Sequence, residues 1–431
     1  MERHEKISAK PSRREFLAAS AAALPVASSA WAAGSDTIRL GLIGCGGRGT
    51  DAALEAMEAD RGVNLVAAGD LLLDRAQEKR SLFKTKRPDQ AVLTLDHCFS
   101  GFDAYKRVIE QSDVVIIANA AKFHPMHLTA AIQAGKHVFV EKPHAIDPLG
   151  IKAVKAACAL AKEKNLCVVS GLHSRYDAGY REAVERIYDG AIGRITHIEE
   201  NFLRAPYVLY PRKAGLSEVE WQASNQYHFH WLSGDDVTQS LVHNVDRASW
   251  MLKGASPIKC HGIGGRSTIK GEQYGNVFDH HSVIYEFPEG VRVYAFCRTI
   301  PGCYNEYSSV AFGTKGTCSL LDMKITGEHP WTYSGPKQRA HFNEHVEMYK
   351  ALRAGKRINN GDYMARSTLI GIMGQISCYS GKEVTWEQVC NSDFCFLPRP
   401  EDVRAGMEAP TKSDAAGVYP PAFTPGVSKL L

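Results

Sequence analysis

The chain has 431 residues and a formal net charge of +4, with 44% hydrophobic and 23% charged residues. This length exceeds one ordinary domain and suffices for two domains with separate cores. The composition is typical of a soluble globular protein, and the small net charge gives no indication of a nucleic-acid or membrane-surface partner.

The first 33 residues have the pattern of an export signal. Arg13 and Arg14 lie in a twin-arginine motif at 12–17, and a mildly apolar, alanine-rich stretch follows it. Residues 30–32, Ala-Trp-Ala, supply the small residues of a cleavage site. We therefore expect a twin-arginine signal peptide at 1–33 and a mature protein that is periplasmic or otherwise exported by that route, with no membrane anchor.

The eleven cysteines are dispersed, with no CxxC pair and no zinc-type spacing. Cys390 and Cys395 are the nearest pair, which is a weak indication of a disulfide. A dispersed set is more typical of small buried hydrophobic residues. It also suits a protein that folds in a reducing cytoplasm before twin-arginine export.

Residues 36–172 are predicted to form an α/β domain with a doubly wound parallel sheet. Short apolar strands alternate with amphipathic helices, and the continuous apolar runs are typical of strands buried on both faces. The predicted strands are 37–43, 63–68, 114–118, 138–140 and 167–170, and the predicted helices are 50–59, 127–134 and 149–164.

Residues 173–396 are predicted to form an α+β domain with a largely antiparallel, open sheet. Strand-like runs occur at 195–203, 282–287, 291–298 and 308–312, with one long helix at 237–252. Residues 397–431 contain several prolines and little periodicity, so we expect an arm or a loose tail.

A glycine-rich motif follows the first predicted strand and opens a helix. Gly44, Gly46 and Gly49 have the G-x-G-x-x-G spacing, with Gly47 and Arg48 inside it. In this context the glycines permit a tight turn, approach of a pyrophosphate to the backbone, and close helix–strand packing. Asp70 ends the second strand, where an acid binds the adenosine ribose and repels a 2′-phosphate. The motif therefore predicts NAD as cofactor, with NADP less favoured.

Lys142 follows a predicted buried strand, in the sequence Glu141-Lys142-Pro143. Ligands of open α/β sheets bind at the carboxyl ends of the strands. A lysine there can polarise a substrate hydroxyl or carbonyl. Position alone leaves a surface salt bridge as an equal alternative.

Several segments resemble the Gfo/Idh/MocA family of oxidoreductases: 135–143, 193–195, 313–316 and 380–386, besides the glycine motif. The resemblance implies a Rossmann domain followed by an α/β domain, and a homo-oligomer formed through the open sheet. It also implies that Lys142 is the catalytic lysine. Further residues implied to lie at or near the cofactor are Glu141, Asn119, Ala120, His124 and Arg175, the last also a candidate substrate contact.

The chain departs from the family at one site position. The family usually carries an Asp and a His one helical turn apart, and here His243 matches the His while Gln239 replaces the Asp. Gln239 can bind a sugar hydroxyl but cannot accept a proton, so we expect His243 to be the base and Lys142 its partner. Asp235 or Asp236 could compensate, and Asp236 is the candidate substrate contact of the two, or each could simply cap the helix.

An aromatic and imidazole cluster at 227–231 precedes this helix. Tyr227 is a candidate for stacking on a sugar, and packing between domains is an equal alternative. His228, His230 and Asp235 lack a second pair of ligands at suitable spacing, so we expect no metal site.

We thus expect an NAD-dependent oxidoreductase that exchanges hydride with a hydroxyl-bearing carbon of a sugar or polyol. Since a free NAD pool is not expected outside the cytoplasm, an exported enzyme would need a tightly bound, internally recycled cofactor. One alternative is an NAD-dependent glycoside hydrolase that works by transient oxidation, elimination, water addition and re-reduction. The other is a non-catalytic sugar- or nucleotide-binding relative.

Overall fold

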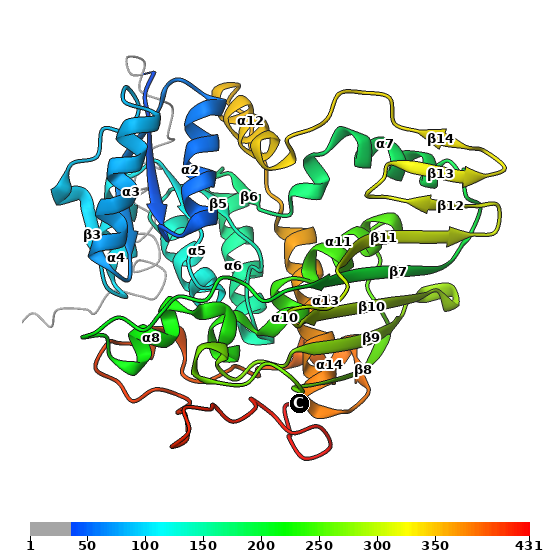
Figure 1. Cartoon of the computed structure of the whole chain (residues 1–431). Coiled ribbons are helices and arrows are strands. Elements are labelled where there is room, and N and C mark those ends of the chain that lie inside the picture. The colour runs from blue at the N-terminus through cyan, green and yellow to red at the C-terminus, as the bar shows by residue number, and fades with distance from the viewer. Residues whose placement is uncertain (1–35) are drawn as a thin grey trace, which may run out of the picture. The chain divides into compact units, whose positions relative to one another are not determined.

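Six parallel strands form the first sheet, in the order β3-β2-β1-β4-β5-β6 (Figure 1). The computed structural model describes residues 36–431, so the predicted signal peptide lies outside the described residues. Every residue of β4 and β5 is buried, as expected for parallel strands covered on both faces. The strands are β1 Ile38–Ile43, β2 Val63–Asp70, β3 Cys98–Ser100, β4 Val114–Ile117, β5 His137–Val140 and β6 Val168–Ser170.

Helices connect these strands and confirm the predicted doubly wound arrangement. They are α2 Gly47–Ala59, α3 Leu73–Lys86, α4 Ala104–Gln111, α5 His124–Gln133 and α6 Pro148–Glu163. The strand order reverses between β1 and β4, which opens a crevice at their carboxyl ends. The glycine-rich loop lies between β1 and α2, beside this crevice.

Nine strands form the second sheet, in the order β14-β13-β12-β11-β7-β10-β9-β8-β15. All neighbouring pairs are antiparallel except β7 with β10, which confirms the predicted, largely antiparallel sheet. The strands are β7 Ile195–Arg204, β8 Lys259–Gly265, β9 His280–Glu286, β10 Arg292–Thr299, β11 Glu306–Gly313, β12 Gly316–Ser319, β13 Lys324–Gly327, β14 Trp331–Thr332 and β15 Val384–Thr385.

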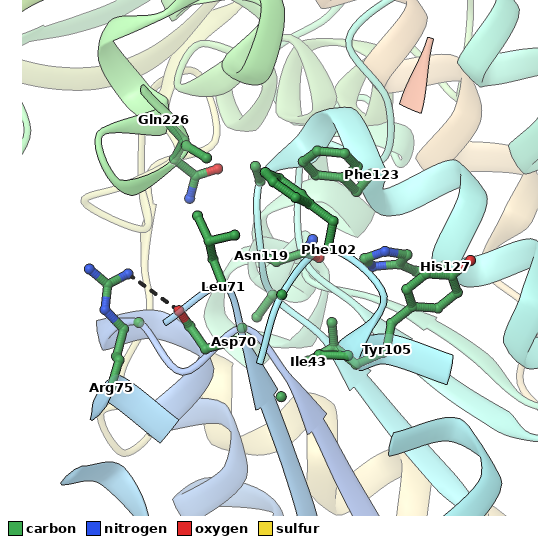
Figure 2. Close-up of a pocket in the computed structure, with 18 of the residues that line it drawn as sticks. Ile43, Asp70, Leu71, Arg75, Phe102, Tyr105, Asn119, Phe123, His127 and Gln226 are labelled. Atoms are coloured by element: carbon green, nitrogen blue, oxygen red, sulfur yellow. Dashed lines mark ion pairs between the residues drawn. The ribbon is translucent and has the colours of Figure 1, made fainter. Parts of the chain in front are cut away.

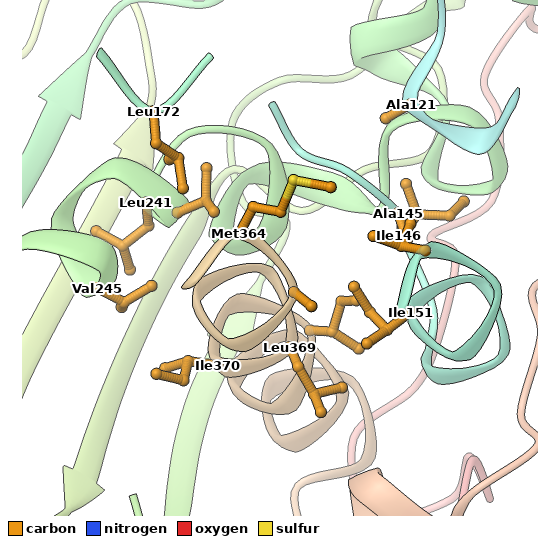
Figure 3. Close-up of a cluster of buried hydrophobic side chains, with 14 of the residues drawn as sticks. Ala121, Ala145, Ile146, Ile151, Leu172, Leu241, Val245, Met364, Leu369 and Ile370 are labelled. Atoms are coloured by element: carbon orange, nitrogen blue, oxygen red, sulfur yellow. The ribbon is translucent and has the colours of Figure 1, made fainter. Parts of the chain in front are cut away.

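Three helices contact this second sheet, α10 (Asp235–Gln239), α11 (Val242–Met251) and α13 (Gly361–Ser380), and α13 also contacts α6 of the first domain. One hydrophobic core therefore runs from the Rossmann helices into the second domain. Figure 3 shows part of it, with Ile146 and Ile151 on one side of α13 and Leu241 and Val245 on the other. The remaining helices of this domain complete the list: α7 Ala178–Tyr188, α8 Glu218–Ser224, α9 His230–Ser233, α12 Ala340–Arg353 and α14 Trp386–Asn391.

The predicted single helix at 237–252 is wrong in one respect: it is broken into α10 and α11. The Ser240 and Leu241 amides both donate to the Asp236 carbonyl, at 2.9 and 3.1 Å, and the His243 amide donates to the Ser240 carbonyl at 3.3 Å. This change from the helical bonding pattern turns the chain. Gln239 and His243 therefore lie on two successive helices instead of one face.

Of the two alternatives expected for residues 397–431, an arm or a loose tail, the packing of this segment favours the arm. Val403, Ala409 and Tyr419 are buried against Val219, Phe229 and Trp231. The tail runs beside the segment that carries α8 (Figure 1). We call residues 205–229, between β7 and α9, the cover segment.

Two further properties concern the described residues. All eleven cysteines lie in them and are free thiols, so Cys390 and Cys395 form no disulfide. None of their helices combines the length and the apolar character that crossing a bilayer requires.

Candidate active site

The glycine-rich loop has the geometry of a dinucleotide cradle. Gly44 has a φ of +95°, and a Cβ there would lie 2.6 Å from the Asn119 amide nitrogen. A Cβ at Gly49 would lie 2.0 Å from the Gly44 carbonyl oxygen, so these two positions admit only glycine. Gly46 and Gly47 instead face open space, because a Cβ at either position would meet no atom of the described residues within 4 Å. A pyrophosphate can approach the backbone there, which fits the predicted cofactor.

A cavity extends from this loop along the ends of β1, β2 and β4 (Figure 2). Asp70 lies at its rim, where the carboxylate accepts hydrogen bonds from the Cys45 and Leu72 amides at 2.8 and 3.2 Å. The Arg75 guanidinium is 3.8 Å from the same carboxylate. Burial raises the pKa of Asp70, and the positive charge of Arg75 opposes that shift. This is the position expected for the acid that binds the adenosine ribose.

The cover segment lines the other side of the cavity. Its residues Ala223, Ser224 and Gln226 are part of the lining, and Figure 2 shows Gln226 opposite Asp70. The Lys213 amino group forms an ion pair with Asp74 of α3 at 2.8 Å, and Arg75 lies over the Tyr210 ring at 5.3 Å. The second domain thus contacts the Rossmann crevice at the rim that α3 forms.

The predicted cofactor contacts after β4 have different environments. Asn119 and Ala120 line the cavity, and the Asn119 Oδ1 atom is buried without a hydrogen-bond partner among the described residues. An unsatisfied buried acceptor indicates a site for a donor from a ligand. His124 instead contacts the carbonyl oxygens of Asn119 and Pro143, at 2.9 and 2.8 Å, and so connects the segments that follow β4 and β5.

Glu141 and Arg48 form a buried ion pair next to Lys142. The Arg48 Nε atom donates to Glu141 at 2.6 Å, and its Nη1 atom donates to Glu55 at 2.9 Å. Burial alone would raise the pKa of Glu141, and the charges of Arg48, His341 and Lys142 outweigh it, so this pKa is lowered. Arg48 therefore positions Glu141 at the end of β5.

The structure brings Lys142, Gln239 and His243 together. The Lys142 Nζ atom donates to the Gln239 backbone carbonyl at 2.8 Å. His243 is 9% exposed, and its Nδ1 atom has no hydrogen-bond partner among the described residues. Burial lowers the pKa of His243 well below its ordinary value, and the nearby charge of Lys142 lowers it further. His243 is therefore a neutral imidazole at pH 7 and can accept a proton.

The other predicted substrate contacts lie in polar networks of the second domain. Asp236 accepts hydrogen bonds from Arg204 and Ser240, at 2.7 and 2.5 Å. Tyr227 stacks on Tyr207, with ring centroids 4.2 Å apart. Tyr227 and Asp236 line one small pocket, and neither Lys142 nor His243 lines it.

Arg175 is held in an ion pair with Asp246, at 2.9 to 3.1 Å, below the ring of Tyr363. These contacts give Arg175 a structural function between the chain after β6 and α11. A contact of Arg175 with cofactor or substrate stays a prediction.

Several site residues escaped sequence reasoning. Arg75 was detectable, because a basic residue five positions after the ribose-binding acid can return to it along α3. His173 and His341 were not detectable from the sequence. They reach the site only through the packing of distant segments, His173 against His243 and His341 against His173. The cavity also has a hydrophobic lining, formed by Phe102, Tyr105 and Phe123. These residues lie in a loop, in α4 and in a short 3-10 helix respectively, outside the elements predicted from the sequence.

The glycine cradle, the Asp70 carboxylate and the parallel sheet together define a dinucleotide-binding enzyme. Residues 38–172 match the family model GFO_IDH_MocA, described as "Oxidoreductase family, NAD-binding Rossmann fold". The chain is accordingly an NAD-dependent oxidoreductase whose Rossmann domain, residues 38–172, is similar to that of the Gfo/Idh/MocA family.

Two curated proteins are similar to the chain. "Inositol 2-dehydrogenase 3" of Saccharopolyspora erythraea is 28% identical over 296 residues, which cover 68% of this chain and 75% of that protein. "Inositol 2-dehydrogenase 4" of the same organism is 30% identical over 218 residues, covering 50% of this chain and 54% of the relative.

Among solved structures, GenD2 from gentamicin A biosynthesis in complex with NAD superposes with a TM-score of 0.62 at 18% identity, over 81% of this chain and 96% of that one. The aldose-aldose oxidoreductase from Caulobacter crescentus, complexed with glycerol, has a TM-score of 0.62 at 17% identity, over 81% of this chain and 99% of that one. At these identities the structures support the shared fold.

Proposed function

We propose that the enzyme exchanges hydride between NAD and a hydroxyl-bearing carbon of a cyclic polyol or sugar. The observation that carries this proposal is the buried His243 imidazole, whose pKa is lowered by burial and by the charge of Lys142, the lysine at the carboxyl end of β5. The names of the curated relatives, inositol 2-dehydrogenases, favour a polyol.

Each residue of the site has a distinct task in this proposal. When bound, NAD supplies the nicotinamide carbon that takes or returns the hydride. His243 accepts the proton of the reacting hydroxyl, and the Lys142 ammonium stabilises the negative charge that develops on its oxygen. The Gln239 amide can bind a neighbouring hydroxyl. In the reverse direction His243 returns the proton.

We further propose that the cofactor is retained and recycled in an exported protein. Retention is supported by the cover segment, because Ala223, Ser224 and Gln226 line the cavity and would contact a dinucleotide bound in it. The tail in turn supports the cover segment. Gln222 donates to the Thr411 carbonyl at 2.7 Å and accepts a hydrogen bond from the Trp231 indole at 2.8 Å. Export itself rests on the twin-arginine pattern.

The test begins with the protein purified from its native host after fractionation. The bound nicotinamide is measured first, and then inositols, other polyols, aldoses and glycosides are supplied with and without added NAD. We expect bound NAD in the exported fraction and its reduction by a polyol in a single turnover. A cofactor-free protein that needs NAD stoichiometric with product would contradict recycling. Glycoside cleavage without net reduction would instead establish the hydrolase alternative.

A further inference from the structure

Three histidines from three separate segments form a row that begins at the reacting centre. The His243 ring stacks on the His173 ring, with centroids 4.9 Å apart and planes 22° apart. His173 opens a short 3-10 helix, His173–Tyr176, that follows β6. The His341 ring, from α12, meets His173 edge-on with centroids 4.1 Å apart. The row thus joins α11, the end of the Rossmann sheet and α12.

The two ends of this row differ in their access to solvent. His243 is buried beside Lys142, whereas the side chain of His341 is 41% exposed. All three rings have a buried Nδ1 atom without a hydrogen-bond partner among the described residues. No structural hydrogen bond within residues 36–431 therefore explains why three imidazoles lie in series, since apolar or aromatic side chains would pack as well.

The reaction needs a path for a proton at this place. Each oxidation of a hydroxyl gives one hydride to the cofactor and one proton to the base. In the reverse half-reaction His243 returns this proton to the substrate, whereas in a net oxidation it must lose the proton to solvent before it can act again. The side chain four residues before His243 is Gln239, which cannot accept the proton.

We propose that His173 and His341 relay the proton between His243 and solvent, replacing a carboxylate partner of the base. The hydroxyl O–H bond breaks as the His243 N–H bond forms, and the same charge then passes to His173, to His341 and to water. No other atom or electron moves along the row. Neighbouring rings at these separations can exchange the proton after ring rotation or through one intervening water.

The charges around the row favour movement of the proton from His243 toward His341. Lys142 and Arg247 face His243, and Arg247, Arg48 and Lys142 face His173, so burial and these cations keep the pKa of both rings well below the ordinary value. Burial and the charges of Arg48 and Lys142 also lower the pKa of His341, to about 4, but the negative charge of Glu141 opposes this shift. Its Nδ1 atom lies 3.6 Å from the buried carboxyl of Glu344. A proton is thus held most easily at the exposed end.

Substitutions that preserve packing can separate a relay from a structural contact. His173→Phe keeps an aromatic ring against His243 and removes the ring nitrogens. His341→Ala opens the exposed end of the row to small buffer molecules. We expect each variant to lower the rate of steady-state turnover roughly tenfold or more, within the range for removed acid–base groups, while NAD affinity is unchanged. Imidazole in the buffer should restore much of the rate of His341→Ala and should not accelerate the wild type.

His345→Phe is the matched control. His345 lies in the same helix α12, is fully buried and has unpartnered ring nitrogens among the described residues. Its ring packs against Phe139, with centroids 4.4 Å apart, and so lies outside the row. Its substitution should leave turnover and its response to imidazole unchanged. Wild-type turnover in His173→Phe, or a loss in His341→Ala that imidazole does not reverse, would overturn the relay.

A titration of the protein without substrate gives an independent readout. Nuclear magnetic resonance of histidine-labelled protein reports each ring pKa, with signals assigned by the single variants. A protonated His341 disfavours protonation of His173, so His341→Phe should raise the pKa of His173, whereas His345→Phe should not. An unchanged His173 pKa would mean that the rings are uncoupled and would refute the relay. The inference rests on the proposed hydride transfer, yet this titration decides it even if no polyol reduces bound NAD.

Discussion

Asp70 and Arg75 lie at the same rim of the cofactor cavity with opposite charges. Asp70→Ser removes the carboxylate that would repel a 2′-phosphate and leaves the Arg75 guanidinium free to attract it. We expect the ratio of NADP to NAD affinity to rise roughly tenfold or more, because a partly buried charge pair near 4 Å contributes about 1–4 kcal/mol.

Isothermal titration of cofactor-free Asp70→Ser with both dinucleotides measures this ratio. Glu78→Ser is the control, since Glu78 is exposed on the same helix α3 and pairs with Lys79. An unchanged preference in Asp70→Ser would show that another residue selects the cofactor.

Lys142 and His243 should be needed for turnover and not for cofactor binding. Lys142→Met and His243→Ala are each expected to lower kcat by roughly 10²–10⁴, the range for a positioned acid or base. Gln239→Ala should mainly raise KM, because its amide can bind but cannot titrate. Gln239→Asp tests whether a carboxylate partner can be rebuilt. Steady-state kinetics with titrated NAD binding provide the measurement, and near-normal kcat in either of the first two variants would exclude that residue.

The depressed pKa of His243 sets the acidic limit of the reaction. A base must be neutral to accept a proton, so oxidation falls as pH drops through the pKa of His243. Because burial and Lys142 place that pKa well below 6.5, the acidic limb of kcat/KM for polyol oxidation should begin below pH 6.5. Lys142→Met removes a positive charge beside His243, so it should raise the pKa of His243 and shift the acidic limb to higher pH. An inflection at or above 6.5 in the wild type would contradict a buried, neutral base.

Among single residues, the sequence predicts those site residues that lie in contiguous motifs. The glycine loop, Asp70 and Lys142 each lie at a strand end that local pattern defines. The relation between Gln239 and His243 was misjudged, because the helix is interrupted at Ser240 and Leu241, whose amides both donate to the Asp236 backbone carbonyl. His173 and His341 are 168 positions apart, and only tertiary packing brings them into contact.

Among the elements, the long helix α13 had no recognisable sequence pattern. Seventeen of its twenty residues are buried, because the second sheet lies on one side and α6 on another. Hydrophobic periodicity requires an exposed face, so a helix enclosed by protein lacks it. The helix α3 was missed for the opposite reason, since only Ala76 and Phe83 of it are buried.

The tail illustrates a limit of composition. Its prolines prevent regular structure, but irregular chain can still bury side chains against a neighbour, as Tyr419 does against Phe229 with ring centroids 5.0 Å apart. Its hydroxyl also donates to Glu218 of α8. The tail is therefore a support for the cover segment.

Removing this support should accelerate cofactor release. Tyr419→Ala deletes a fully buried ring, so α8 loses packing and the cover segment opens more often. We expect the dissociation rate of NAD to rise several-fold, with little change in the chemical step once NAD is saturating. Stopped-flow displacement of bound NADH fluorescence measures the rate. Tyr304→Ala, at a ring that is 73% exposed in the second domain, is the control. Equal dissociation rates would show that the tail does not retain the cofactor.

For the whole molecule, the alternation of strands and helices sufficed to predict a parallel sheet followed by a largely antiparallel one. It could not predict that the two domains share a single core (Figure 3). That continuity depends on α13, which joins α6 to α11. It fixes the positions of Lys142, from the first domain, and His243, from the second.

The cover segment has a thermodynamic consequence. A dinucleotide that stays in its cavity cannot equilibrate with any external nucleotide, so the direction of reaction would follow the relative potentials of two hydroxyl–carbonyl couples alone. Such an exchange obeys ping-pong kinetics, with parallel lines in double-reciprocal plots for a polyol donor and an oxo-sugar acceptor. Intersecting lines, or rates that depend on added NAD, would show that the nucleotide leaves between turnovers. With parallel lines, the enzyme would equalise the oxidation states of two carbohydrate pools without drawing on the reducing power of the cell.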